Sequence, residues 1–115
     1  MLYDVMCPRY EQAAQLLGKK WTNLILRVLM GRPRRFGEFR HQVPELSERL
    51  LSERLRELED EGLVRRIVAD CRPVLILYEL TPKGHELEIV VQSIQAWADR
   101  WICIEDGYAV KARTR

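Results

Sequence analysis

Apolar residues in the first half of the chain recur at helical spacing. A first helix is predicted over Pro8–Leu17, because Pro8 suits the first helical position and Gly18 suits the end. A second helix is predicted over Lys20–Met30, where apolar residues fall three and one positions apart and form one buried stripe. The members of this stripe are Trp21, Leu24, Ile25, Val28 and Leu29.

Two further helices follow with a short turn between them. The segment Phe36–Val43 is predicted to be helical and to stop before Pro44, which disfavours helix at the residue preceding it. The segment Glu48–Glu61 is predicted as the next helix, with Ser47 as its N-cap and a buried stripe of Leu51, Leu55 and Leu58. Two such helices joined by a tight turn are typical of a helix-turn-helix.

The pattern then changes to branched residues. Leu63–Val68 and Val74–Leu80 are predicted strands, and the turn-prone residues between them predict a β-hairpin. Thr81 and Pro82 open a last helix, expected to run unbroken to Trp101 or Ile102. The predicted fold is therefore mainly α with a small β-hairpin, a winged helix-turn-helix. Residues 1–106 are expected to form this domain and residues 107–115 a loose, flexible tail.

The last helix, about residues 82–102, carries an apolar stripe longer than one small core covers. An excess of this kind predicts a subunit interface, and a two-fold homodimer is the commonest solution. The alternative is that the helix covers only its own core. The stripe residues expected in the dimer interface are Leu87, Val90, Val91, Ile94, Trp97 and Trp101, with Ala98 among them.

Composition narrows the class of protein. The chain has 115 residues, 47% of them apolar and 31% charged, as in a single soluble domain. It has no apolar run of membrane-spanning length and no secretion signal at its start, so a cytoplasmic protein without membrane association is expected. Three scattered cysteines and two histidines predict neither a disulfide framework nor a metal site. No catalytic or cofactor-binding motif is present, so we expect a non-enzyme without a cofactor.

The face of helix Glu48–Glu61 opposite its leucine stripe carries the candidate DNA-reading residues. Arg49 and Ser52 lie in its leading half, which usually reaches base edges, and Arg56 is better placed for a phosphate. Glu53 either holds Arg49 through an i,i+4 pair or accepts a hydrogen bond from a cytosine amino group. Ser47 and Glu48 stand at the leading end. The acidic run Glu57, Glu59, Asp60 and Glu61 is expected to lie away from the duplex.

Other arginines form clusters suited to phosphates, which position a protein on DNA without reading its sequence. The hairpin contributes Arg65, Arg66 and, at its turn, Arg72. The approach to the third helix contributes Arg32, Arg34, Arg35 and Arg40. The predicted partner is therefore double-stranded DNA.

Cys7 is the one candidate for special chemistry. A thiol at a helix N-terminus faces positive partial charge and unpaired N–H groups, which favour the reactive thiolate. The alternative is an inert capping residue. Cys103, at the end of the proposed dimer helix, could bridge to Cys7 between subunits.

An ordered series of motifs resembles the HxlR-type winged helix-turn-helix regulators, relatives of MarR. The series runs from Cys7-Pro8 and Leu17-Gly18-Lys19-Lys20-Trp21 through Arg35-Phe36-Gly37-Glu38-Phe39 and Leu55-Arg56-Glu57-Leu58-Glu59 to Tyr78-Glu79-Leu80-Thr81-Pro82-Lys83-Gly84. The resemblance implies a dimeric regulator, here expected to be a repressor, on an inverted repeat. Several members of that family are thiol sensors of oxidants or electrophiles and use the cysteine matching Cys7, some of them together with a second cysteine of the partner subunit. The resemblance therefore points to Cys7 as the sensing thiol.

Two departures from the family pattern are visible. Lys19 stands where the family usually has a second glycine, and the hairpin turn reads Asp70-Cys71-Arg72-Pro73. Two other hypotheses compete with thiol control of a DNA-binding protein. One is a noncovalent effector bound between the DNA-binding core and the dimer helices; the other is a winged helix that binds protein and never DNA.

Overall fold

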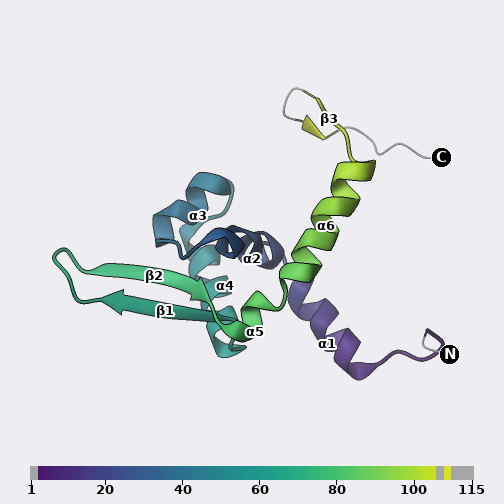
Figure 1. Ribbon diagram of the computed structural model, residues 1–115, viewed down its shortest axis with the longest axis horizontal. Helices are drawn as coiled ribbons and strands as arrows, with labels where there is room; N and C mark the ends of the chain where they lie inside the picture. Colours follow the sequence, from purple (N-terminus) through teal and green to yellow (C-terminus); the bar gives the residue numbers. More distant parts are fainter. Residues whose placement is uncertain (1–2, 106–107, 110–115) are drawn as a thin grey trace.

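The computed structural model describes residues 3–105 and 108–109 and has the order of a winged helix-turn-helix (Figure 1). This confirms the predicted fold class. The first helix has the predicted bounds, and the other boundaries fall within two residues of those expected, apart from the last helix. In chain order the elements are α1 (Pro8–Leu17), α2 (Thr22–Gly31), α3 (Phe36–Gln42), α4 (Glu48–Asp60), β1 (Val64–Ala69), β2 (Leu75–Leu80), α5 (Pro82–His85), α6 (Glu88–Trp101), β3 (Ile104–Glu105) and β4 (Tyr108–Ala109).

The core lies between α2, α3, α4 and the base of the hairpin. The predicted stripe of α4 is buried, and so are Ile25, Val28 and Leu29 of the stripe predicted for the second helix. Trp21, also predicted on that stripe, is instead the half-buried N-cap of α2. Leu24 was expected on the buried stripe and is instead 46% exposed, because it lies at the edge of that face. The buried apolar residues are Ile25, Leu26, Val28, Leu29, Phe39, Leu46, Leu51, Leu55, Leu58, Leu63, Val64 and Leu80.

Local capping fixes the two helices of the helix-turn-helix. The Ser47 Oγ accepts a hydrogen bond from the Leu50 amide at 3.1 Å, as the sequence predicts for an N-cap. At the start of α3, the Glu38 carboxylate accepts from the Arg35 amide at 3.0 Å. Leu46, in the turn between α3 and α4, is fully buried and anchors that turn to the core. These contacts leave the opposite face of α4 free of the body.

The hairpin pairs β1 with β2 in antiparallel register, with Arg66 opposite Tyr78. Arg34 adds a bridge to its far edge, since Arg34 and Tyr78 exchange backbone hydrogen bonds of 2.9 and 2.8 Å. The edge-to-face contact of Tyr78 with Phe39 ties the strand to α3. The hairpin therefore projects from the core as a supported wing (Figure 1).

The last helix is not continuous, contrary to the prediction. A turn at Glu86 and Leu87 separates α5 from α6, and the Leu87 amide donates to the Gly84 carbonyl at 3.0 Å. The cause is the tight seating of α5: Thr81 donates to the Gly62 carbonyl, and a Cβ at Gly84 would lie 2.2 Å from the Leu63 oxygen. The chain leaves this fixed point in a new direction as α6.

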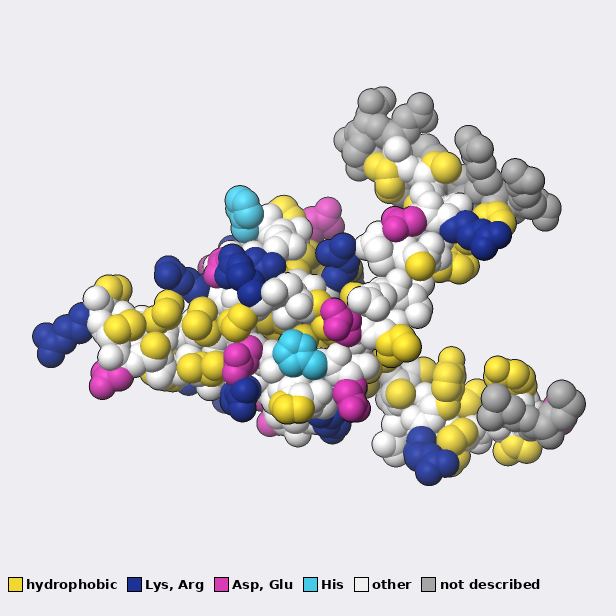
Figure 2. Space-filling model, viewed as in Figure 1, with side chains coloured by type: hydrophobic (Ala, Val, Ile, Leu, Met, Phe, Trp, Pro, Cys, Tyr) yellow, Lys and Arg dark blue, Asp and Glu magenta, His cyan; other side chains and the backbone are white. Residues whose placement is uncertain are grey.

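Helices α1 and α6 leave the body as two diverging arms (Figure 1). The radius of gyration is 16.5 Å, against about 13 Å for a compact chain of this length. Apolar side chains cover parts of both arms (Figure 2). After α6, β3 and β4 form a small antiparallel pair, so part of the expected tail lies in a strand. Residues 106–107 and 110–115 of that tail lie outside the described residues.

Candidate nucleic-acid interface

A groove of about 830 Å³ runs between the exposed face of α4 and the wing. Four predicted residues of the α4 face line it together with the predicted wing residue Arg66. Ser52 is exposed, as a base-reading residue must be. The lining residues are Arg49, Ser52, Glu53, Arg56, Glu59, Asp60, Arg66 and Tyr78.

The arginines between Arg27 and Arg72 divide into two groups by their contacts. In the first group the guanidinium is already bound within the chain: Arg34 donates to the Val28 carbonyl at 3.1 Å, and Arg65 pairs with Glu79 at 2.6 Å. Arg32, Arg40, Arg27 and Arg54 belong to this group as well. Three members of the predicted phosphate cluster, Arg32, Arg34 and Arg40, thus have partners within the chain, and a phosphate contact for them stays a prediction.

The second group has no hydrogen bond or ion pair from its guanidinium within the described part of the chain. It comprises Arg35, Arg49, Arg56, Arg66 and Arg72. All five were candidates from the sequence. Arg49, Arg56 and Arg66 line the groove, Arg35 is exposed at the start of α3, and Arg72 is exposed at the wing turn. These cations are therefore available to an external anion.

The carboxylates of this face are only partly where the sequence placed them. Glu53 pairs with Arg54 at 3.8 Å rather than with Arg49, because Arg54 is its neighbour on the flank of α4. Glu48 faces Arg40 at 3.5 Å, next to the capping residue Ser47. Glu59 and Asp60, expected to lie away from the duplex, line the C-terminal end of the groove. The groove is thus basic at one end and acidic at the other.

Sequence reasoning missed Tyr78 as a groove residue. The sequence places Tyr78 only in a strand motif, yet its side chain lines the groove. The signal was available, since the strand register places Tyr78 opposite Arg66 and cross-strand partners share one face of the hairpin.

The Cys7 thiol stands at the N-cap of α1, as predicted, and is partly exposed. The amide of Tyr10, and then the side chain and amide of Arg9, hold the pKa of this thiol below its ordinary value. The Cys7 sulfur makes no side-chain capping hydrogen bond. The lowered pKa therefore comes from N–H donors that lie near the sulfur at the start of the helix. These neighbours therefore favour the thiolate of Cys7 relative to an ordinary cysteine.

Cys103 is a partly exposed free thiol directly after α6, and Cys71 is an exposed one at the wing turn. The start of α1 and the end of α6 lie at the tips of diverging arms, so Cys7 and Cys103 of one chain are kept apart (Figure 1). No group of three His, Cys, Asp or Glu side chains within the described residues could hold a metal ion. No helix within those residues is long and apolar enough to cross a membrane.

The predicted dimer stripe divides along α6. Leu87 packs against the chain's own core, and Val90 and Val91 are half-buried at the base of the arm. Farther out, Ile94 is 47% and Trp97 58% exposed, while Trp101 is half-buried beside Arg100. The outer half of the arm presents its apolar side chains to solvent.

Known proteins resemble this chain in sequence and in structure. The HTH-type transcriptional regulator YodB of Bacillus subtilis (strain 168) is 47% identical over 98 residues, which span 85% of this chain and 88% of that protein. The crystal structure of diamide-treated YodB matches with a TM-score of 0.71 at 46% identity, over 88% of this chain and 99% of that one. A quinone-bound form of YodB matches with the same TM-score. The redox regulator HypR in its oxidized form matches with a TM-score of 0.79 at 33% identity, over 85% and 100% of the two chains.

The family profile of the HxlR-like helix-turn-helix matches residues 16–106. This range includes the core, the helix-turn-helix, the wing and α6. With a winged fold and curated relatives that are HTH-type transcriptional regulators, the chain belongs to the HxlR-like helix-turn-helix family.

Proposed function

We propose that the protein is a transcriptional repressor that binds a double-stranded inverted-repeat operator as a homodimer and is controlled by modification of Cys7. The observation that carries the DNA-binding part is the set of arginines without a partner in the described chain. They gather on the α4 face, the start of α3 and the wing, whereas the other arginines between Arg27 and Arg72 have partners within the chain. A phosphate backbone supplies the missing anions.

In this proposal α4 enters the major groove. Arg49 and Ser52 reach base edges from the leading half of the helix, with Ser47 and Glu48 at its tip. Glu53 contributes as an acceptor for a cytosine amino group, since it does not hold Arg49. The flanking cations contact phosphates, with Arg72 at the wing turn nearest the adjoining backbone. These cations are Arg35, Arg56, Arg66 and Arg72.

The exposed apolar side chains of the arms support the homodimer. Ile94 and Trp97 on α6 and Tyr10 on α1 are large exposed apolar side chains, and exposed apolar surface of this kind often marks a protein interface. A two-fold axis between paired arms would aim two α4 helices at successive major grooves about 34 Å apart or at a multiple of that distance.

Thiol control rests on the lowered pKa of Cys7 and on relatives studied as diamide-treated, quinone-bound and oxidized forms. With diamide, the Cys7 thiolate adds to an azo nitrogen, and a second thiolate then attacks the Cys7 sulfur, so that a disulfide forms, the S–N bond breaks and the hydrazine leaves. Two thiols lose two electrons and two protons, and diamide becomes the hydrazine. Cys103 of the partner subunit is the proposed second thiol, since the arms separate the two cysteines of one chain.

A noncovalent effector is a second candidate for the signal. A crevice of about 950 Å³ lies between α1, the end of α4 and α5, with apolar walls from Leu16, Leu17, Leu63 and Leu87. It fits the expectation of a ligand between the DNA-binding core and the arms. A Cys7→Ser protein that still releases DNA with its inducer would favour this candidate.

The test is selection of genomic fragments by the reduced protein and by the diamide-treated protein. The proposal expects an inverted repeat among fragments bound in the reduced state and its loss after oxidation. A steep fall of affinity with salt would identify phosphate contacts. No enrichment of any fragment would instead favour a winged helix that binds protein, and full modification of Cys7 with unchanged affinity would exclude the thiol switch.

A further inference from the structure

Helix α1 touches the body only at its C-terminal end. No residue of α1 is buried, and only Leu16 and Leu17 pack against the core. The preceding turns of the helix reach outward as an arm (Figure 1). The direction of this arm is therefore decided at the turn that joins α1 to α2.

Backbone hydrogen bonds hold that turn at both ends. The Gly18 amide donates to the Ala14 carbonyl at 2.8 Å, and the Thr22 amide to the Lys19 carbonyl at 3.1 Å. Trp21 takes a left-handed conformation with φ of 76°, which is costly for a bulky side chain and persists only where its surroundings enforce it. A movement of α1 must then carry the Lys19–Trp21 turn with it.

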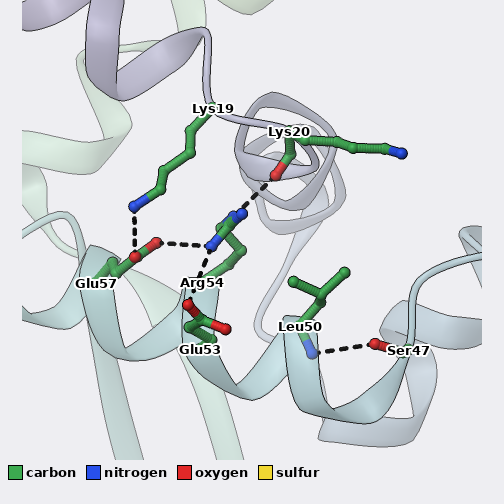
Figure 3. Close-up of polar contacts among 7 residues, drawn as sticks. All are labelled: Lys19, Lys20, Ser47, Leu50, Glu53, Arg54 and Glu57. Atoms are coloured by element: carbon green, nitrogen blue, oxygen red, sulfur yellow. Dashed lines mark hydrogen bonds and ion pairs between the residues drawn. The ribbon is translucent and has the colours of Figure 1, made fainter.

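Arg54 of α4 grips this turn (Figure 3). Its Nε donates to the Lys20 carbonyl at 2.9 Å, and its Nη1 pairs with the Glu57 carboxylate at 3.3 Å. The other oxygen of Glu57 accepts from Lys19 Nζ at 2.5 Å. Two points of the turn are thus tied to two successive turns of α4.

The network also reaches the groove. Arg54 Nη1 lies 3.8 Å from the Glu53 carboxylate, and Glu53 lines the groove beside Arg49. The Arg54 side chain is 11% exposed, so its contacts are screened far less than those of an open surface pair. The Lys19 ammonium holds the pKa of Glu57 below its ordinary value, which keeps this carboxylate charged for both cations.

We propose that Arg54 is a positioning residue that, with Glu57 and Lys19, fixes the angle between the α1 arm and the recognition helix α4. This rests on the proposed function, in which α1 belongs to the dimer arms and α4 enters DNA. The angle then sets the separation of the two α4 helices, and hence the spacing of operator half-sites. A displacement of α1 caused by modification of Cys7 would be transmitted to α4 through these contacts of Lys19, Arg54 and Glu57.

A lysine cannot replace Arg54 in this role. The guanidinium fork binds a carbonyl through Nε and a carboxylate through Nη1 at once, whereas an ammonium is a compact point charge. If Arg54 acted only by its charge, Arg54→Lys would keep the function. If it acts by its geometry, Arg54→Lys fails like Arg54→Gln.

The experiment selects bound sequences from randomised half-sites with variable spacers, using reduced full-length protein. Arg54→Lys, Lys19→Met and Glu57→Gln are compared with the parent. The double variant Arg65→Gln/Glu79→Gln is the matched control, since it removes an Arg–Glu pair on the wing that does not touch the turn. Thermal unfolding of each variant identifies any loss of fold. Lys19→Met and Glu57→Gln change partly exposed side chains, so they still test the proposal if the Arg54 variant does not fold.

The proposal expects the three variants to accept a broader range of spacers and to lose about three- to tenfold in preference for the parent's optimal spacer. Their affinity for a single half-site should stay close to that of the parent. Unchanged spacer preference in folded Arg54→Lys and Glu57→Gln would overturn the proposal. A parent protein that selects no sequence at all would instead overturn the proposed function.

Discussion

Arginine side chains of this chain differ in role because their surroundings differ. Arg34, 16% exposed, donates to the Val28 carbonyl and faces Glu38, so it holds the bridge to the wing. Arg49 has no such partner within the described residues and lies in the groove. From the sequence alone, Arg34 and Arg49 are both candidate DNA contacts, and nothing distinguishes their roles. Only the folded chain shows which guanidinium already has a partner and which is open to an external anion.

Arg49→Ala should reduce the preference for operator over random DNA, whereas Arg72→Ala should weaken binding to both similarly. The reason is that a base-edge contact contributes about 1–3 kcal/mol of discrimination, while a phosphate contact carries no sequence information. Mobility-shift titrations at fixed salt measure both affinities. The double variant Arg65→Gln/Glu79→Gln is the control, because it removes one positive and one negative charge and leaves the net charge of the protein unchanged. If both single variants bind like the parent, this docking of α4 is wrong.

Cys7 should react as a thiolate at lower pH than an ordinary thiol, whose pKa is about 8.5. Its lowered pKa has the Tyr10 amide and the Arg9 side chain among its causes. Arg9→Ala should raise the pKa and slow alkylation at neutral pH. Iodoacetamide rates at Cys7, followed by mass spectrometry across a pH series, test this. A midpoint at or above the ordinary value in the parent protein would contradict it.

At the scale of elements, the start of α3 is held by a charged carboxylate. Arg32 first, and then the Arg35 amide, lower the pKa of Glu38 to about 2 in the folded protein. The unfolded carboxyl has a pKa of about 4.3. A lowered folded pKa gives stability that is present above the unfolded value and is lost as pH falls through the folded one.

Glu38→Gln should therefore be less stable than the parent at neutral pH, and the difference should shrink between about pH 4.3 and about pH 2. Denaturant unfolding across this range measures it. Glu45→Gln is the control, because the exposed Glu45 has no ion pair within the described residues. A difference between Glu38→Gln and parent that stays constant with pH would exclude this linkage.

The close packing of α5 against the base of the wing depends on the absence of a side chain at Gly84. Gly84→Ala places a Cβ 2.2 Å from the Leu63 oxygen, so the contact between α5 and the wing base must open. We expect a loss of about 1–3 kcal/mol in the free energy of unfolding. Gly37→Ala in α3 is the control, since nothing lies within 4 Å of its added Cβ, and it should stabilise by up to about 1 kcal/mol. Equal effects of the two substitutions would contradict this account.

The sequence predicts the elements of this fold well because period and capping are local properties. Ser47, the leucine stripe of α4 and the hairpin are each visible in a few residues. The break between α5 and α6 is not, since it arises from a close approach of Gly84 to Leu63 across the fold. The pairing of Glu53 with Arg54 rather than Arg49 and the position of Glu59 and Asp60 in the groove likewise depend on tertiary placement.

For the whole molecule, the departure at Lys19 acquires a structural meaning. A residue that the family pattern usually leaves as glycine here pairs with Glu57 of the recognition helix. On the other side, α5 is tied to the end of α4 by Lys83, whose Nζ donates to the Glu61 carbonyl at 2.7 Å. Both arms thus start from contacts with α4, so the arrangement of two arms in a dimer bears directly on the recognition helix.

Ile94→Asp should convert the proposed dimer to a monomer and weaken operator binding far more than binding to an isolated half-site. Ile94 is 47% exposed on the outer part of α6, and a carboxylate there would be buried without a partner between paired arms. Val68→Asp is the matched control: Val68 is 54% exposed but lies on the wing, away from both arms. Sedimentation velocity gives the mass of each variant, and circular dichroism confirms its fold. A folded Ile94→Asp protein that sediments as a dimer would show that the interface lies elsewhere.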